Sequence, residues 1–311
     1  MRVFHKLSLL AVVVALFYVL PLFVNSSYIL YTLFLMFIFV GLSTGWNIIG
    51  GLAGQVSIGH SLFFGIGAYS TAVLWLAGYH PILGTVLGAI LSTLLALILT
   101  PTFRLRGIYF AVGTLFMNEV VKQIFINWNE VGDGVGLYLP IPTVFLLEPF
   151  YYASLTYSLM VLVIAYLIGR SRLGLTLTAI REDETAASVI GVKILRYKVV
   201  ALMISAVIFA IGGGVYTSYQ TYIEPHSMFS LEWGISPLFM TILGGVGTLM
   251  GPVIGAVVYT LIGQSVAILA NIRLLTFAIV IIIVVRFMPK GLTGYWRHLV
   301  RVVKSQKAMP R

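Results

Sequence analysis

The chain contains 311 residues, of which 60% are hydrophobic and only 9% are charged. Soluble domains carry roughly a quarter charged residues, so this composition excludes a soluble enzyme or a nucleic-acid-binding protein and indicates a membrane protein. Cysteine is absent, which excludes disulfides, thiolate metal sites and cysteine catalysis. The net charge of +10 is therefore read as a matter of membrane topology rather than of an anionic partner.

Apolar segments of about 20 residues recur along the chain, as in membrane-spanning helices and unlike the ten-residue strands of a barrel. The first lacks the small-residue cleavage site of a signal peptide, so we interpret it as a retained span. Spans are predicted at 7–24, 28–50, 58–78, 82–100, 108–126, 152–169, 199–219, 236–250, 252–270 and 274–288. The sequence thus predicts an all-α polytopic protein of the cell membrane with about ten crossings. The third and eighth segments are glycine-rich, and we expect them to be broken or re-entrant.

The distribution of charge predicts the orientation in the membrane. All lysines and arginines except Lys122 and Arg273 fall within segments 2–6, 104–106, 170–198 and 286–311. Acidic residues gather towards the opposite face, at Glu119, Glu130, Asp133, Glu148, Glu224 and Glu232. Because cytoplasmic loops are rich in lysine and arginine, both termini are predicted to be cytoplasmic. Topology also accounts for the basic tail, so no nucleic-acid partner is needed.

An internal repeat is visible when the chain is shifted by 167 positions. Gly84, Val86, Gly88, Ala89, Thr93 and Leu94 then coincide with Gly251, Val253, Gly255, Ala256, Thr260 and Leu261. Equivalent spans lie five crossings apart, so the second copy is inverted in the membrane, as in many transporters. We predict one transmembrane domain over 1–311, with repeats at 28–126 and 195–293, a cytoplasmic loop at 170–198 and a basic tail at 289–311. An inverted pair suggests a pathway between the two halves.

The richest polar segment within the membrane lies between Gly45 and Gly67. It contains Asn47, Gln55, Ser57 and His60, with Gly54 and Gly59 between them. Polar side chains are costly against lipid, so these must point inward, where we interpret them as lining a substrate path. The alternative is mutual hydrogen bonding in a packed bundle, which is the favoured interpretation for His60 taken alone. The glycine-rich run 244–252 is taken as the counterpart and is far less polar.

Two other polar features have less direct interpretations. Glu119 and Lys122 lie three residues apart on one helix face, which predicts a structural ion pair rather than a coupling-ion site. In the loop 170–198, Asp183 is placed to cap a short helix that Gly191 ends in a left-handed conformation. Such a short helix is marginal alone and is expected to dock on another surface. Its small face would consist of Ala186, Ala187 and Ile190, and lying on lipid headgroups is the alternative.

Four runs give the chain a resemblance to a known family. They are Gly45–Tyr69, Arg104–Thr114, Ala179–Tyr197 and Leu243–Ala256. Together they resemble the permease subunit of branched-chain amino acid ABC importers, more narrowly the M-type of its two paired permeases. The resemblance implies two related permeases, two cytoplasmic ATPase subunits and an extracytoplasmic amino-acid-binding protein. It also implies that Glu184, Ala186, Ala187, Ile190 and Gly191 belong to the segment that couples the permease to an ATPase.

Several functional expectations follow. The chain has no G-x-x-x-x-G-K-[ST] phosphate loop, so we expect it not to be an enzyme, to bind no cofactor or metal, and to rely on ATP held by partner chains. Outer loops with Trp128, Asp133 and Glu224 are expected to face the binding protein. Permeases for urea or short amides in the same family are an alternative. A self-sufficient secondary transporter is a weaker one, because buried charge is scarce.

Overall fold

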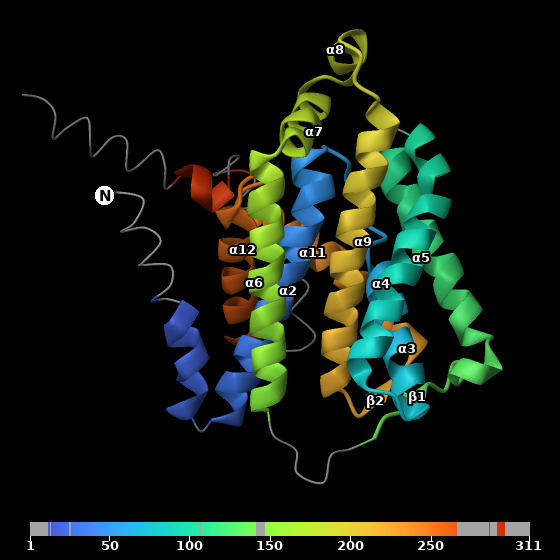
Figure 1. Cartoon of the computed structure of the whole chain (residues 1–311), viewed down its shortest axis with the longest axis vertical. Helices are drawn as coiled ribbons and strands as arrows, with labels where there is room; N and C mark the ends of the chain where they lie inside the picture. Colours follow the sequence, from blue (N-terminus) through green and yellow to red (C-terminus); the bar gives the residue numbers. More distant parts are fainter. Residues whose placement is uncertain are drawn as a thin grey trace, which may run out of the picture.

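The protein is an assembly of long helices, shown in a computed structural model (Figure 1). The structure describes residues 12, 14–24, 26–105, 107–140, 147–265, 286 and 291–295. The prediction of an all-α polytopic membrane protein is confirmed. The predicted tenth span 274–288, apart from residue 286, and most of the basic tail lie outside the described residues, as do Arg2, Lys6, Arg106 and Arg273.

The helices follow the predicted apolar segments closely. In chain order the larger ones are α2 (Ser27–Trp46), continued by the π-helix η2 (Asn47–Leu52), then α3 (Ser61–Leu76), α4 (Pro81–Ile98), α5 (Ile108–Ile126), α6 (Glu148–Arg170), α7 (Arg172–Glu182), α9 (Ile194–Tyr219), α11 (Leu231–Gly244) and α12 (Met250–Ser265). Shorter elements are the 3-10 turns η1 (Leu20–Leu22), η3 (Thr100–Arg104) and η4 (Asn129–Val131), and the helices α8 (Glu184–Val189) and α10 (Pro225–Met228). Two short strands, β1 (Leu137–Tyr138) and β2 (Tyr222–Ile223), pair antiparallel.

Among the described helices, four are long and apolar enough to cross a membrane by length and composition. They are Ser27–Leu52, Pro81–Ile98, Glu148–Arg170 and Ile194–Tyr219. By contrast, α3 has 16 residues and α11 has 14, which at about 1.5 Å per residue is shorter than a hydrocarbon core of about 30 Å. Each follows a non-helical segment. The non-helical stretch before α3 contains Gly59, as the glycine content of the third predicted segment suggested. The stretch before α11 contains no glycine, because the glycines of the eighth predicted segment lie at the end of α11 and in the turn to α12.

The 167-residue repeat reappears in the helix boundaries. Shifted by that offset, 27–52 covers the whole of α9, 61–76 falls on α11 and 81–98 falls on α12, each within a few residues. The counterpart of α5 would be 275–293, outside the described residues except 286 and 291–293. In Figure 1, α2 and α9 run in opposite directions through the molecule. The described helices thus keep both the spacing and the inverted sense of the repeat.

The two repeats are interlocked rather than side by side. The helices α3 and α4 of the first repeat pack on α9 of the second, and α11 and α12 of the second pack on α2 of the first. Backbones touch at these crossings: a Cβ built on Gly67 would lie 1.9 Å from the Ala210 carbonyl oxygen, and one on Gly213 would lie 2.1 Å from that of Phe64. Small residues permit such close helix packing in membranes.

The molecule has two distinct ends (Figure 1). At one end, α7 and α8 project beyond the long helices, and at the other lie β1 and β2. We call these the α8 end and the β end. Arg104, Arg170 and Arg181 belong to elements of the α8 end, whereas Glu130 lies in the connection that leads to β1. This separation of charge matches the pattern used to predict that the α8 end is cytoplasmic.

Candidate functional site

Two segments without a long helix interrupt the bundle. We call residues 53–60 break 1 and residues 220–230, which include β2 and α10, break 2. At the 167-residue offset 53–60 corresponds to 220–227, so the two are repeat counterparts. A Cβ on Gly234 would lie 2.2 Å from the Ile58 carbonyl oxygen, and one on Gly65 would lie 2.4 Å from the Phe229 ring. Each break therefore packs against the helix that follows the other.

Break 1 is held by a chain of hydrogen bonds through His60, which is fully buried. Its Nδ1 lies 2.8 Å from the Ser57 hydroxyl and its Nε2 lies 2.9 Å from the Ser205 hydroxyl on α9. Ser205 donates its own proton to the Gly45 carbonyl oxygen, at 2.9 Å. The Ser205 oxygen can then only accept from His60, which places the imidazole proton on Nε2 and leaves Nδ1 to accept from Ser57. Each of the side-chain polar atoms of Ser57, His60 and Ser205 therefore has a hydrogen-bond partner.

Two neighbouring positions of the helix α5 form hydrogen bonds with the two breaks. The Thr114 hydroxyl accepts from the backbone N–H groups of Ile58 and Gly59, at 3.2 and 3.4 Å. One turn further on, Asn118 donates to the Phe229 carbonyl oxygen, at 3.0 Å. Non-helical backbone at membrane depth must be satisfied by protein or water. Two side chains four residues apart on one helix face meet part of that need for both breaks.

The two repeats also meet at a junction towards the α8 end, where η2 contacts the turn between α11 and α12. Asn47 accepts from the Gly247 N–H at 2.8 Å and donates to the Thr248 carbonyl oxygen at 3.0 Å. Arg181 of α7 reaches the same place and donates to the Gly51 carbonyl oxygen at 2.8 Å. A Cβ on Gly247 would lie 2.4 Å from Nη1 of Arg181. The guanidinium thus touches both repeats.

The short helix α8 has the caps that its sequence predicts. Asp183 accepts from the N–H groups of Thr185 and Ala186, at 2.7 and 3.0 Å, and Gly191 has a φ of +87°. Within α8, Oε1 of Glu184 accepts from two elements at once. It forms an ion pair with Lys198 of α9, which is 5% exposed, and it accepts from Gln55 of break 1 at 3.3 Å. The exposed projection is therefore connected directly to both repeats.

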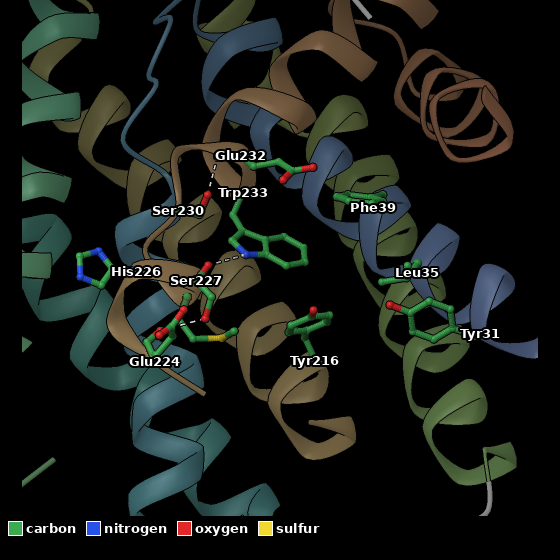
Figure 2. A pocket seen from close by; sticks show the side chains of 11 residues that line it. Tyr31, Leu35, Phe39, Tyr216, Glu224, His226, Ser227, Ser230, Glu232 and Trp233 are labelled. Carbon is green, nitrogen blue, oxygen red and sulfur yellow. Dashed lines mark hydrogen bonds between the residues drawn. The ribbon is translucent and has the colours of Figure 1, made fainter. Parts of the chain in front are cut away.

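A cavity of about 410 Å³ opens towards the β end, between α2, α9 and break 2 (Figure 2). Its lining residues are Tyr31, Leu35, Phe39, Tyr216, Glu224, His226, Ser227, Met228, Ser230, Glu232 and Trp233. Trp233 donates through Nε1 to the Ser227 carbonyl oxygen at 3.1 Å, which fixes the indole plane. A second cavity of about 380 Å³ lies at the α8 end beside Gln55, Glu184 and Lys198. Both breaks therefore border a cavity, one towards each end of the molecule.

Comparison with known proteins places this architecture in a family. A family model described as the branched-chain amino acid transport system permease component matches residues 28–285. The chain belongs to that permease family. The match covers both repeats, the loop with α7 and α8, and both breaks. No solved structure matches the chain.

Similar permeases have been described in bacteria and archaea. The high-affinity branched-chain amino acid transport system permease protein LivM of Salmonella typhimurium is 26% identical, over 88% of this chain and 72% of that protein. LivM of Escherichia coli is 26% identical, over 84% of this chain and 68% of its own length. A probable branched-chain amino acid transport permease of Methanocaldococcus jannaschii is 27% identical, over 68% and 69% respectively.

Within this permease, the residues predicted to line a substrate path lie in three different surroundings. Asn47, Ser57 and His60 are buried and hydrogen-bonded within the chain, as the bundle-packing alternative describes. Gln55 borders the α8-end cavity. Gly54 has a φ of +70°, and Gly59 lies so close to α5 that a Cβ would be 1.9 Å from the Thr114 carbonyl oxygen.

The β-end cavity contains residues that sequence reasoning did not select, among them Tyr31, Phe39, Tyr216, Glu232 and Trp233. The signal was present in the repeat. At the 167-residue offset, the counterpart of 45–67 is 212–234 and not the run 244–252, so the second copy is polar too. The interpretation of 244–252 as the less polar counterpart of 45–67 was therefore wrong.

The remaining predicted residues are distributed as follows. Ala187 is 3% exposed and packs inward, whereas Val189 and Ile190 are 83% and 77% exposed, so the apolar face of α8 differs from the one predicted. Trp128 is exposed in the connection after α5, and Asp133 follows it with a φ of +50°. Glu224 borders the β-end cavity, although it was assigned to an outer docking loop. Glu119 and Lys122 form the predicted ion pair, at 2.7 Å.

Proposed function

We propose that this chain is a translocating subunit of an ABC importer for branched-chain or similar small amino acids. A second permease would complete the path, two separate ATPase subunits would drive it from the α8 end, and an extracytoplasmic binding protein would deliver substrate at the β end. In this proposal the chain hydrolyses nothing, and ATP is held by the partner chains. Membership of the permease family supports the role in transport. One structural observation supports the proposal that separate ATPase subunits drive it from the α8 end.

That observation is the construction of α8. It projects from the bundle and exposes Val189 and Ile190, yet it is tied at Glu184 to Lys198 and Gln55. A six-residue helix is too short to be stable alone in water. An exposed apolar tip on an internally anchored helix is suited to insertion into a groove of another protein, with force passing to both repeats.

Ala187 is buried, so a substitution there would disturb α8 itself and would not test its docking. We instead propose the double substitution Val189→Asp/Ile190→Asp. The matched control is Leu175→Asp on α7, an apolar side chain that is 69% exposed at the same end. All variants are assembled with the partner permease and ATPases of the same genome in proteoliposomes.

The expected result is that the double variant loses ATP-driven leucine uptake and no longer retains the ATPase subunits on purification, while Leu175→Asp retains both. The apolar tip would be replaced by two charges that must be desolvated on docking. Unchanged uptake by the double variant would overturn the assignment of α8. Leucine uptake by the purified chain without any ATPase would instead support a self-sufficient transporter.

A further inference from the structure

The helix α5 lies at one edge of the bundle, on the side away from α6 and α12, and has two different faces (Figure 1). One face is turned inward, where Thr114 and Asn118 are buried and α5 packs mainly on α3, η3 and α10. Exposed residues recur every three or four positions on the other face, which makes one stripe along the helix. This α5 stripe consists of Tyr109, Val112, Phe116, Val120, Gln123 and Asn127.

The α5 stripe is apolar towards the α8 end and polar towards the β end. Beside Val120, the side chain of Glu119 is 47% exposed and forms the ion pair with Lys122 at 2.7 Å. Gln123 donates to Oε1 of Glu119 at 3.4 Å. Both hydrogen-bonding partners of this carboxylate belong to α5 itself. The ion pair is therefore built on the exposed side of the helix and not in its contact with the bundle.

This ion pair lies well inside the predicted span 108–126. At about 1.5 Å per residue, Glu119 is about 10 Å from the end of α5 at Ile126. Lys122 is nearer to that end, yet it reaches back to Glu119, whereas a lysine facing lipid would extend towards the interface. Charged groups at such a depth are costly against hydrocarbon and face protein or water instead.

The helix α4 provides a comparison within the same repeat. The large residues exposed on α4 are all aliphatic, and its sequence contains no charged residue. It is one of the four described helices that are long and apolar enough to cross a membrane. With 19 residues α5 has the length of a span, but it is not among those four. The exposed face of α4 suits lipid, and the α5 stripe does not.

We propose that the α5 stripe faces a hydrated translocation path between this chain and the partner permease, with the Glu119–Lys122 pair on its wall. A pair of opposite charges lets a zwitterion pass without holding either of its ends strongly, as a path requires. Thr114 and Asn118 hold both breaks from the other face of α5, so the path runs beside them. The inference rests on the proposed function for its substrate and its partner.

Cysteine accessibility tests this placement, because the chain has no native cysteine. The test variants are Phe116→Cys and Val120→Cys, at positions that are 62% and 53% exposed on the α5 stripe. The matched controls are Leu91→Cys and Leu87→Cys on α4, where the exposed fractions are 41% and 39%. Each control lies as many residues from the β-end terminus of its helix as its test position does. All four substitutions keep both charges of the ion pair.

Each variant is assembled in nanodiscs with the partner permease and ATPases of the same genome and treated with the impermeant cationic thiosulfonate MTSET. Mass spectrometry of the intact chain follows the labelling. The cysteines on α5 should react at least tenfold faster than those on α4, because a thiol ionises and reacts only where water reaches it. Cysteines on α5 that react no faster than their controls overturn the proposal.

Uptake distinguishes a path from a wet surface without a role in transport. In proteoliposomes, treatment of the Val120→Cys importer should lower ATP-driven leucine uptake at least fivefold, because a bulky cation then occupies the path. The Leu87→Cys importer should keep its uptake after the same treatment, which also controls for cysteines of the partner chains. Complete labelling of Val120→Cys without loss of uptake contradicts the path assignment.

This experiment fails independently of the proposed function. If the importer moves leucine with ATP while the α5 cysteines react no faster than their controls, the path assignment falls and the proposed function stands. If the importer does not move leucine but the α5 cysteines react faster, the hydrated α5 stripe stands and the proposed function falls.

Discussion

Individual amide side chains hold the bundle together where helix backbone is interrupted. Asn47 is the clearest case, because it uses both ends of its side chain on the backbone of the other repeat, at Gly247 and Thr248. Its side chain leaves little room, since a Cβ on Gly51 would lie 1.9 Å from its oxygen. Asparagine at this position therefore joins η2 to the turn between α11 and α12.

Replacing this amide should be costly. Asn47→Ala leaves one N–H and one carbonyl oxygen without their partner in a largely buried place, which predicts a loss of about 2–4 kcal/mol in stability. Thermal unfolding followed by intrinsic fluorescence should show a clearly lower Tm. Asn127→Ala is the control, because Asn127 is exposed and donates only to Gln123 within its own turn. An Asn47→Ala protein as stable as the control would show that the junction does not hold the repeats.

At the level of elements, α7 connects the projecting α8 to the interior. Its residue Arg181 donates to the Gly51 carbonyl oxygen at the end of η2, and its guanidinium also lies against Gly247. Arg181 donates in addition to Glu182, at 2.8 Å. The planar guanidinium can serve several acceptors at once, which an ammonium group cannot do in the same geometry. A displacement of α8 therefore reaches both repeats through one side chain.

This connection predicts a specific defect. In the assembled importer, Arg181→Ala should leave the subunits associated but reduce leucine uptake per ATP hydrolysed at least fivefold, the lower end of usual coupling energies. Arg172→Ala removes the same charge from the first turn of the same helix and is the matched control. Both quantities are measured on the same vesicles. Parallel loss of uptake and ATPase activity, with their ratio preserved, would contradict a role in transmission.

At the scale of the whole molecule, the packing of the two repeats on each other limits how the permease can move. The inverted repeat suggested a pathway between two halves, but the halves are interlocked, because α3 and α4 pack on α9 and α11 and α12 pack on α2. Close approaches such as Gly67 to Ala210 leave no layer of side chains between backbones. We expect the described core to move as one body against a partner permease, while the breaks adjust locally.

A disulfide between α3 and α9 tests this expectation. Because the chain has no native cysteine, the introduced pair is the only one that can form within it. A Cβ on Gly214 would lie 2.7 Å from the Thr71 hydroxyl oxygen, which is close to disulfide geometry. We propose Thr71→Cys/Gly214→Cys with Thr85→Ala, which relieves the crowding of Gly214 by Thr85. Oxidation should leave ATP-driven uptake within about twofold, as the joined helices do not separate. Transport lost on oxidation and restored by reduction would show that α3 and α9 must part.

Much of this architecture was predictable from sequence. The long helices follow apolar segments. The repeat offset aligns α2 and η2 with α9 because the segment 27–52 and α9 have the same length. The caps of α8 were predictable because Asp183 and Gly191 act locally.

Contacts that depend on tertiary packing were not predictable. The partner of His60 is Ser205, which lies 145 residues away and is brought close only by the packing of break 1 on α9. The inward orientation of Ala187 depends likewise on how α8 meets its neighbours. The β-end cavity was missed for another reason: glycine-rich runs were matched by composition, although the same offset pointed to 212–234.

The pairing of β1 with β2 at the β end connects two segments that are far apart in the sequence. Leu137 pairs with Ile223 and Tyr138 with Tyr222, so the connection between α5 and α6 is stitched to the residue just before Glu224. Tyr138 is 76% exposed. Under the proposed function, a binding protein that contacts Tyr138 would also move Glu224 at the border of the β-end cavity, so docking outside and rearrangement of the cavity would occur together.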